Sequence, residues 1–164
     1  MNKNKYLAEF IGTALLLAVI TGSGFMGDVL ARNNNAVALL GNSIATGAAL
    51  YVLISSLMPI SGAHFNPVVS LVDWANKKLK TSELIIYFVC QFLGAIFGVI
   101  LCHLMFGLPI LQESTNPRSG VNYYFSEFIS TLVLLSVIYF GVKNDKKQIP
   151  ILVALTVTAG YWFT

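Results

Sequence analysis

The segment from Ser61 to Asn76 carries hydrogen-bonding side chains within an apolar stretch. Its first part, from Ser61 to Val68, reads Ser-Gly-Ala-His-Phe-Asn-Pro-Val. Asparagine followed by proline predicts a helix start, because Asn is a favoured N-cap and Pro suits the first helical position. Asn66 would then accept a backbone N–H through its side-chain oxygen and keep its NH₂ group as a fixed donor. This chemistry binds water or hydroxyl groups without forming covalent bonds.

A helix from Pro67 to about Asn76 would be roughly 15 Å long, about half of a hydrocarbon core. The segment is too apolar for a water-exposed loop and too short to cross, so we predict a re-entrant half-helix that starts at the midplane. The positive end of its dipole would repel cations, protons included. Backbone carbonyls near Gly62 and Ala63 would serve as acceptors. The pattern favours neutral solutes, and we expect no metal, cofactor or nucleic acid.

Glu9, Glu127 and His64 are ionisable side chains in or beside apolar segments. Because a carboxylate is costly to bury in a membrane, each Glu either hydrogen-bonds irregular loop backbone or carries protons in an active transporter. We favour the first role. An intramembrane hydrolase that pairs Ser61 or Ser70 with His64 is a further alternative, although no Gly-x-Ser-x-Gly motif supports it.

The composition indicates a membrane protein, since 56% of the 164 residues are hydrophobic and only 10% are charged. A soluble domain has about 25% charged residues. Backbone groups in lipid must be satisfied internally, and the alternating pattern of membrane strands is missing, so the apolar segments are predicted helices. The fold class is all-α, with about five transmembrane helices plus one re-entrant half-helix. The apolar segments are Tyr6–Met26, Ala36–Met58, Leu84–Met105, Tyr123–Val142 and Ile149–Thr164.

The basic residues predict the orientation of these helices. Of the ten Lys and Arg residues, eight fall on one side when the segments are threaded across a membrane, and Arg32 and Arg118 fall on the other. This bias predicts a cytoplasmic N-terminus. The eight are Lys3, Lys5, Lys77, Lys78, Lys80, Lys143, Lys146 and Lys147.

The chain also repeats itself, because Ala-Glu-Phe-Ile-Gly-Thr at 8–13 returns as Ser-Glu-Phe-Ile-Ser-Thr at 126–131. The second copy begins three transmembrane helices after the first, an odd number, so it crosses in the opposite direction and the repeats are inverted. We predict one domain over 1–164, with a first repeat at about 6–106 and a second at about 123–164. Within the first repeat, Gly94 and Gly98 predict a close helix contact.

These features together resemble the aquaporins and aquaglyceroporins, the major intrinsic protein family. The resemblance rests on Ser61 to Val68, Ala8-Glu9-Phe10, Gln91-Phe92-Leu93-Gly94-Ala95 and Glu127, and it covers nearly the whole chain. It implies a channel for water and small neutral solutes such as glycerol, not an enzyme, assembled as a homotetramer in the lipid bilayer. The same resemblance gives Glu9 and Glu127 the role of bracing the pore loops. It also implies that the pore is lined by Gly62, Ala63, His64, Asn66, Pro67 and Val68.

Two departures from the family pattern stand out. Val68 replaces the usual Ala after Asn-Pro, and the second Asn-Pro-Ala loop is missing; by the repeat offset it belongs beyond Thr164. The last apolar segment holds 16 residues, short of the roughly 20 of a full crossing, so we expect a C-terminally truncated member. Thr46 stands 20 residues before Asn66, at a filter position of the family. Its small side chain suggests a wider opening, for glycerol-like or uncharged metalloid solutes.

Two alternatives to a passive channel stay open at this point. A secondary transporter would also show inverted repeats and broken helices. A truncated fragment would not conduct, since half of the constriction would be missing.

Overall fold

The structure is a computed structural model that describes residues 3–113 and 119–164 of the chain. Four helices, α1, α2, α4 and α5, are long and apolar enough to cross a membrane among these residues, and the predicted all-α class is confirmed. Helix α6 has 15 residues, fewer than a full crossing needs. The elements are α1 Lys3–Leu30, α2 Asn35–Ser61, α3 Pro67–Ala75, α4 Thr81–Met105, α5 Val121–Asn144, the 3₁₀ turn η1 Lys146–Gln148 and α6 Ile149–Phe163.

The helices extend beyond the apolar segments that predict them. Helix α1 begins at Lys3 and not at Tyr6, and α4 begins at Thr81 and not at Leu84. Hydropathy marks only the part of a helix that lies in lipid, whereas the backbone ladder continues into polar flanks. Lys5 of α1 and Glu83 of α4 form an ion pair there. The pair joins two polar helix starts that hydropathy alone does not detect.

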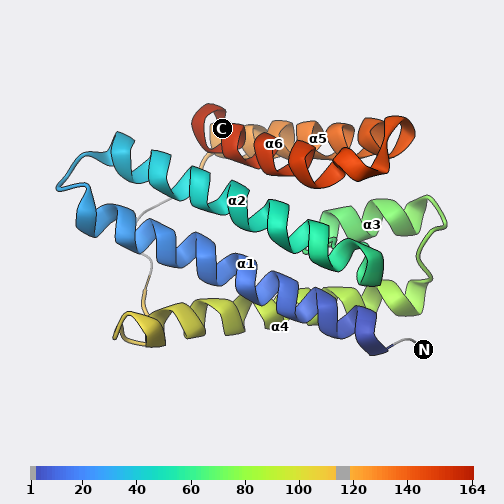
Figure 1. Ribbon diagram of the computed structural model, residues 1–164, viewed down its shortest axis with the longest axis horizontal. Helices are drawn as coiled ribbons and strands as arrows, with labels where there is room; N and C mark the ends of the chain where they lie inside the picture. Colours follow the sequence, from blue (N-terminus) through green and yellow to red (C-terminus); the bar gives the residue numbers. More distant parts are fainter. Residues whose placement is uncertain (1–2, 114–118) are drawn as a thin grey trace.

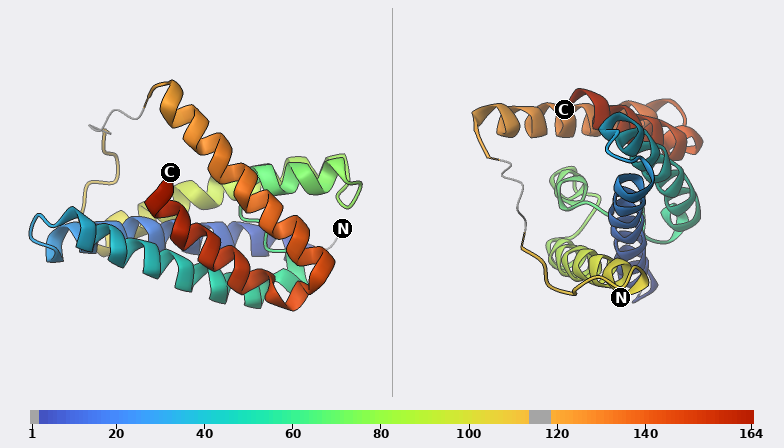
Figure 2. Two further views of the ribbon diagram at one scale, coloured as in Figure 1. Left: turned by 90° about the horizontal axis from the view of Figure 1, so that it is seen from above. Right: turned by 90° about the vertical axis from the view of Figure 1, so that its left-hand side faces the viewer.

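Helix α1 packs between α2 and α4, while α6 packs against α2 and α5, and α3 lies against α4. Figure 1 shows that α3 runs from the middle of the bundle to one end. The chain start, the α3–α4 connection and the α5–α6 connection all lie at that same end. Viewed along the bundle, α4, α1, α2 and α5 border α3 on three sides (Figure 2). The bundle therefore encloses on three sides a short helix that enters from one end and stops midway.

The basic residues are divided unequally between the two ends of the bundle. The eight lysines of the orientation prediction lie at the chain start, in the α3–α4 connection, and in or beside the α5–α6 connection. Arg32 lies in the α1–α2 connection at the opposite end. Arg118 lies outside the described residues.

Small residues set the closest helix contacts. A Cβ atom on Gly94 would lie 2.5 Å from the carbonyl oxygen of Phe10, and one on Gly98 would lie 2.1 Å from that of Ala14. Neither distance is possible for real atoms, so α1 and α4 can touch only because both positions are glycine. The predicted Gly-x-x-x-Gly contact is confirmed.

Candidate functional site

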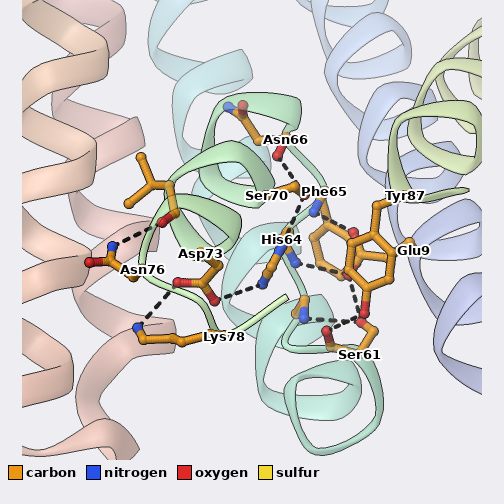
Figure 3. A network of polar contacts seen from close by, with 12 residues as sticks. Glu9, Ser61, His64, Phe65, Asn66, Ser70, Asp73, Asn76, Lys78 and Tyr87 are labelled. Carbon is orange, nitrogen blue, oxygen red and sulfur yellow. Dashed lines mark hydrogen bonds and ion pairs between the residues drawn. The ribbon is translucent and has the colours of Figure 1, made fainter. Parts of the chain in front are cut away.

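The half-helix α3 begins at Pro67, as predicted, and its start is organised by Asn66. Asn66 adopts an extended backbone, with φ −148° and ψ 125°, and its Oδ1 accepts a hydrogen bond of 2.8 Å from the Val68 N–H. Its carbonyl accepts the first helical bonds, from the Ser70 N–H at 3.2 Å. The Asn66 NH₂ group has no hydrogen-bond partner among the described residues. In Figure 3 the Asn66 amide points away from the polar network, so it is a donor open to a solute.

The loop before α3 has a strained backbone. Gly62, Ala63 and Phe65 have φ angles of 92°, 50° and 47°. Left-handed backbone costs roughly 1–2 kcal/mol for each residue with a Cβ atom. Ala63 and Phe65 therefore need a compensating interaction from elsewhere in the fold.

Glu9 of α1 supplies that interaction. Its side chain is fully buried, and its Oε1 accepts hydrogen bonds from the Ser61 hydroxyl at 2.6 Å and the His64 N–H at 3.0 Å. Its Oε2 accepts from the Phe65 N–H at 2.8 Å and from Gln91 Nε2 at 2.9 Å. Bonds to an ionised acceptor contribute about 1.5–3 kcal/mol each, enough to offset the strain of the loop. The sequence predicts hydrogen bonds from irregular loop backbone to this carboxylate, and Glu9 makes them.

Glu127 of α5 lies elsewhere. Glu127 is exposed, and within 3–113 and 119–164 no hydrogen bond or ion pair reaches its carboxylate. The structure therefore does not bring Glu127 to the loop before α3.

His64 belongs to the loop that precedes α3. Figure 3 shows its ring facing Asp73 of α3. Its Nδ1 lies 3.0 Å from Ser70 Oγ and its Nε2 lies 3.3 Å from Asp73 Oδ2. The hydrogen bond with His64, aided by Lys78 at 3.2 Å, holds the pKa of the Asp73 carboxyl below its usual value. Asp73 therefore stays a carboxylate at the end of the half-helix.

The contact between Ser70 and His64 does not form a hydrolase site. Ser70 is fully buried, and its Oγ also accepts from Gln91 Nε2 at 2.9 Å and contacts the Asn66 carbonyl at 3.2 Å. A serine nucleophile must reach a substrate, and this one is enclosed. Ser61, the other candidate, donates its hydroxyl proton to Glu9.

A cavity of about 670 Å³ lies between α3 and the pair α5 and α6. Of the expected pore residues, Gly62, Ala63, His64, Asn66 and Thr46 line it. Pro67 and Val68 do not. Val69, Val72, Asp73 and Asn76 form the α3 side instead, because residues at this helical spacing share one face and Val68 lies off it. The far wall is mostly apolar and comes from α5 and α6.

Thr46 occupies the cavity wall differently from what the sequence suggests. It has no exposed surface, and its Oγ1 lies 3.0 Å from the hydroxyl of Tyr161 on α6. Tyr161 is partly exposed and lines the cavity. The polar group available to a solute at this level is the Tyr161 hydroxyl, with Thr46 behind it. Sequence reasoning missed Tyr161, because its partner is 115 positions away.

Tyr87 and Gln91 of α4 were also missed as functional residues. Tyr87 is buried, and its hydroxyl donates to the Ser61 carbonyl at 2.7 Å. With Gly94 and Gly98, these residues follow the spacing of one helix face. A stripe of polar and small residues in an apolar helix is the signal that could have located them.

The sequence matches the family model described as Major intrinsic protein over residues 1–163. Aquaglyceroporin AqpS of Rhizobium meliloti (strain 1021) is 45% identical over 158 residues, which cover 96% of this chain and 67% of AqpS. Aquaporin NIP1-1 of Arabidopsis thaliana is 32% identical, with 93% of this chain and 53% of NIP1-1 covered. Aquaporin AqpM of Methanothermobacter marburgensis is 30% identical, with coverages of 86% and 65%. The chain thus spans between about half and two thirds of the length of these curated relatives.

Proposed function

Because this chain belongs to the major intrinsic protein family, and is thus an integral, multi-pass membrane protein, we propose that it forms a passive channel for water and small neutral solutes such as glycerol. The observation that carries the proposal is the start of α3. Asn66 caps the half-helix with its oxygen at 2.8 Å from the Val68 N–H and faces the cavity. A fixed donor at the positive end of a helix dipole suits neutral oxygen-bearing solutes and repels cations.

The pathway would pass from the lysine-bearing end, along the Gly62 and Ala63 backbone and the Asn66 amide, toward Tyr161. His64 would line the first part and hold the α3 start through Ser70. Thr46 would act by supporting Tyr161. Pro67 and Val68 would shape the start of the helix, since they do not face the cavity.

We further propose that the N-terminus is cytoplasmic and that the chain carries a first repeat at about 6–106 and the start of a second at about 123–164. The positions of the eight lysines support this orientation. In the whole protein, Glu127 would brace the loop of the second repeat as Glu9 braces that of the first. On the basis of family membership, we also propose that the protein assembles as a homotetramer with one pore per subunit.

A secondary transporter is the alternative that the Glu9 contacts disfavour. A carboxylate that carries protons must change its partners during transport, yet Glu9 accepts four hydrogen bonds. Two of them come from the backbone N–H groups of His64 and Phe65, and one comes from the Ser61 hydroxyl. Changing these partners would release the strained loop.

The proposal is tested with vesicles that contain the protein made from its intact gene. Water and glycerol permeabilities are measured by light scattering after an osmotic step, with protein-free vesicles as the reference. We expect permeabilities above the reference that do not change when sodium or proton gradients are imposed. Flux that needs an ion gradient would indicate a transporter, and permeability equal to that of the reference would contradict a channel.

A further inference from the structure

A short relay of hydrogen bonds joins α1, α2 and α6 beside the cavity. Ser23 Oγ of α1 lies 2.9 Å from Asn42 Oδ1 of α2 and 2.6 Å from the Val19 carbonyl oxygen of its own helix. Thr46 Oγ1 lies 3.4 Å from the same Asn42 oxygen. Tyr161 OH then lies 3.0 Å from Thr46 Oγ1. Thr46 is fully buried, whereas Tyr161 lines the cavity. Asn42 does not line the cavity, so it can reach a solute only through Thr46 and Tyr161.

The donor of each hydrogen bond in the relay can be assigned, because a hydroxyl has only one proton to donate. Thr46 donates its proton to Asn42 Oδ1, so the contact between Thr46 and Tyr161 requires Tyr161 to donate. The lone pairs of the Tyr161 oxygen are then left for the cavity. At 3.4 Å the bond between Thr46 and Asn42 is long, but Asn42 Oδ1 can only accept, so a Thr46 hydroxyl that keeps this bond has no proton left to donate to Tyr161.

We propose that Asn42 is a positioning residue for solute selection, which fixes the Tyr161 hydroxyl as a hydrogen-bond acceptor toward the cavity. This inference rests on the proposed channel function. It assigns to the Tyr161 level a preference for neutral solutes that carry O–H or N–H donors, over neutral solutes of similar size that only accept.

The helices around the relay are held in register, so Tyr161 cannot turn away from Thr46 at little cost. Trp162 Nε1 donates to Ser43 Oγ at 3.3 Å, and Thr158 Oγ1 lies 3.3 Å from the Ser43 carbonyl oxygen and 2.9 Å from that of Ala154 on its own helix. A Cβ atom on Gly47 would lie 2.0 Å from Thr158 Oγ1. The close contact of α2 and α6 therefore fixes where the Tyr161 hydroxyl lies.

Two groups along the pathway then have complementary roles. Asn66 presents NH₂ donors at the start of α3, and Tyr161 presents an acceptor at a separate level of the cavity. A hydroxyl solute can satisfy both, because it donates and accepts. A solute without donors meets lone pairs at Tyr161, and apolar side chains such as Leu50 and Val157 elsewhere in the cavity wall, so it finds no hydrogen bond at Tyr161.

The test compares glycerol with dimethyl sulfoxide, a small neutral solute without O–H or N–H groups, in vesicles that contain the protein made from its intact gene. In Asn42→Leu, Thr46 loses its acceptor and donates to Tyr161, which then turns its own proton toward the cavity. We expect the ratio of glycerol to dimethyl sulfoxide permeability to fall roughly three- to tenfold, the effect of about one hydrogen bond. Asn42→Asp keeps an acceptor and should keep the ratio. Asn35→Leu, a matched change at an exposed position of α2, should also keep it.

A double-mutant cycle shows whether Asn42 acts through Tyr161. In a Tyr161→Phe background, Asn42→Leu should cause no further change in the ratio. Ser23→Ala, which leaves the Asn42 amide free to turn, should give a smaller fall and keeps the test valid if Asn42→Leu does not fold. Water permeability of each variant reports folding. An equal fall in the Tyr161→Phe background, or an unchanged ratio in conducting Asn42→Leu and Ser23→Ala proteins, overturns the relay alone. A wild-type protein that conducts neither water nor glycerol overturns the channel function and this inference with it.

Discussion

Glu9 shows how one buried charge determines the shape of a loop. The backbone at Ala63 and Phe65 is strained, and the Glu9 carboxylate holds it by accepting from the His64 and Phe65 N–H groups. No neutral side chain offers four acceptor sites. The same carboxylate is also bound by Gln91, which ties α1 and α4 to the loop.

Replacing Glu9 by Gln should destabilise the protein by about 3 kcal/mol, because a buried N–H is left facing an amide NH₂ group. Gln91 can turn its unpartnered Oε1 toward the new amide, so the lasting loss falls on the Phe65 N–H. The apparent free energy of unfolding in detergent measures this effect. Asp28→Asn, at an exposed position in the same helix, is the control and should stay within about 0.5 kcal/mol. Equal stabilities for the two variants would contradict the bracing role.

Asn66→Asp should weaken the exclusion of cations. The substitution keeps a cap acceptor for the Val68 N–H but removes the NH₂ donors and adds a negative charge at the start of α3. A unit charge at 4 Å attracts a cation by about 1–4 kcal/mol between bulk water and a partly buried site, so sodium or proton leak should rise roughly tenfold or more. Dye-reported leak in vesicles measures it. Asn76→Asp, at the other end of α3, should change the leak much less, and an unaltered leak in Asn66→Asp would count against the proposed role of the helix start.

Single-residue roles were predictable where the partner is local and not where it is distant. The Asn66 cap follows from the neighbouring Pro67, because capping is a matter of adjacent residues. Tyr161 and Thr46 meet across 115 positions, and a single sequence contains no signal for such a pair. Val68 was expected to line the pore by analogy with a motif, and it is not among the residues that line the cavity.

Between elements, the contact of α1 with α4 determines where Glu9 lies. Gly98→Ala should destabilise the protein by about 1–3 kcal/mol, since a Cβ atom there would lie 2.1 Å from the Ala14 carbonyl oxygen and the two helices must separate. Gly41→Ala is the control, because no atom lies within 4 Å of its Cβ position and alanine favours a helix. Thermal unfolding in detergent, followed by circular dichroism, compares them. A Gly98→Ala protein as stable as Gly41→Ala would contradict the close packing.

The helices were predictable to within a few residues because lipid imposes a simple rule on them. Every backbone group must bond within its own segment, so apolar stretches become helices. The turn η1, Lys146–Gln148, was not predicted, since it lies among polar residues where that rule does not apply. Its Asp145 cap, which accepts from the Lys147 N–H at 3.0 Å, is a local signal that was overlooked.

At the scale of the whole molecule, the distribution of lysines gives the bundle a direction. Lys143, Lys146 and Lys147 lie around the α5–α6 connection, at the end where α3 also ends. Translocating lysines across a membrane is unfavourable, so this end should stay in the cytoplasm. The half-helix α3 would then enter from the cytoplasmic side.

Labelling of single cysteines from one side of the membrane tests this orientation. Cys90 and Cys102, both free thiols, are first replaced by alanine, and then either Lys147→Cys or Asn35→Cys is introduced at an exposed position. Lys147 lies beside the α5–α6 connection and Asn35 begins α2 at the opposite end. A membrane-impermeant maleimide should label Asn35→Cys in intact cells, and Lys147→Cys only after the membrane is opened. The reverse pattern would place the entry of α3 on the outer side. Labelling of both positions in intact cells would mean that the two ends of the bundle do not lie on opposite sides of the bilayer.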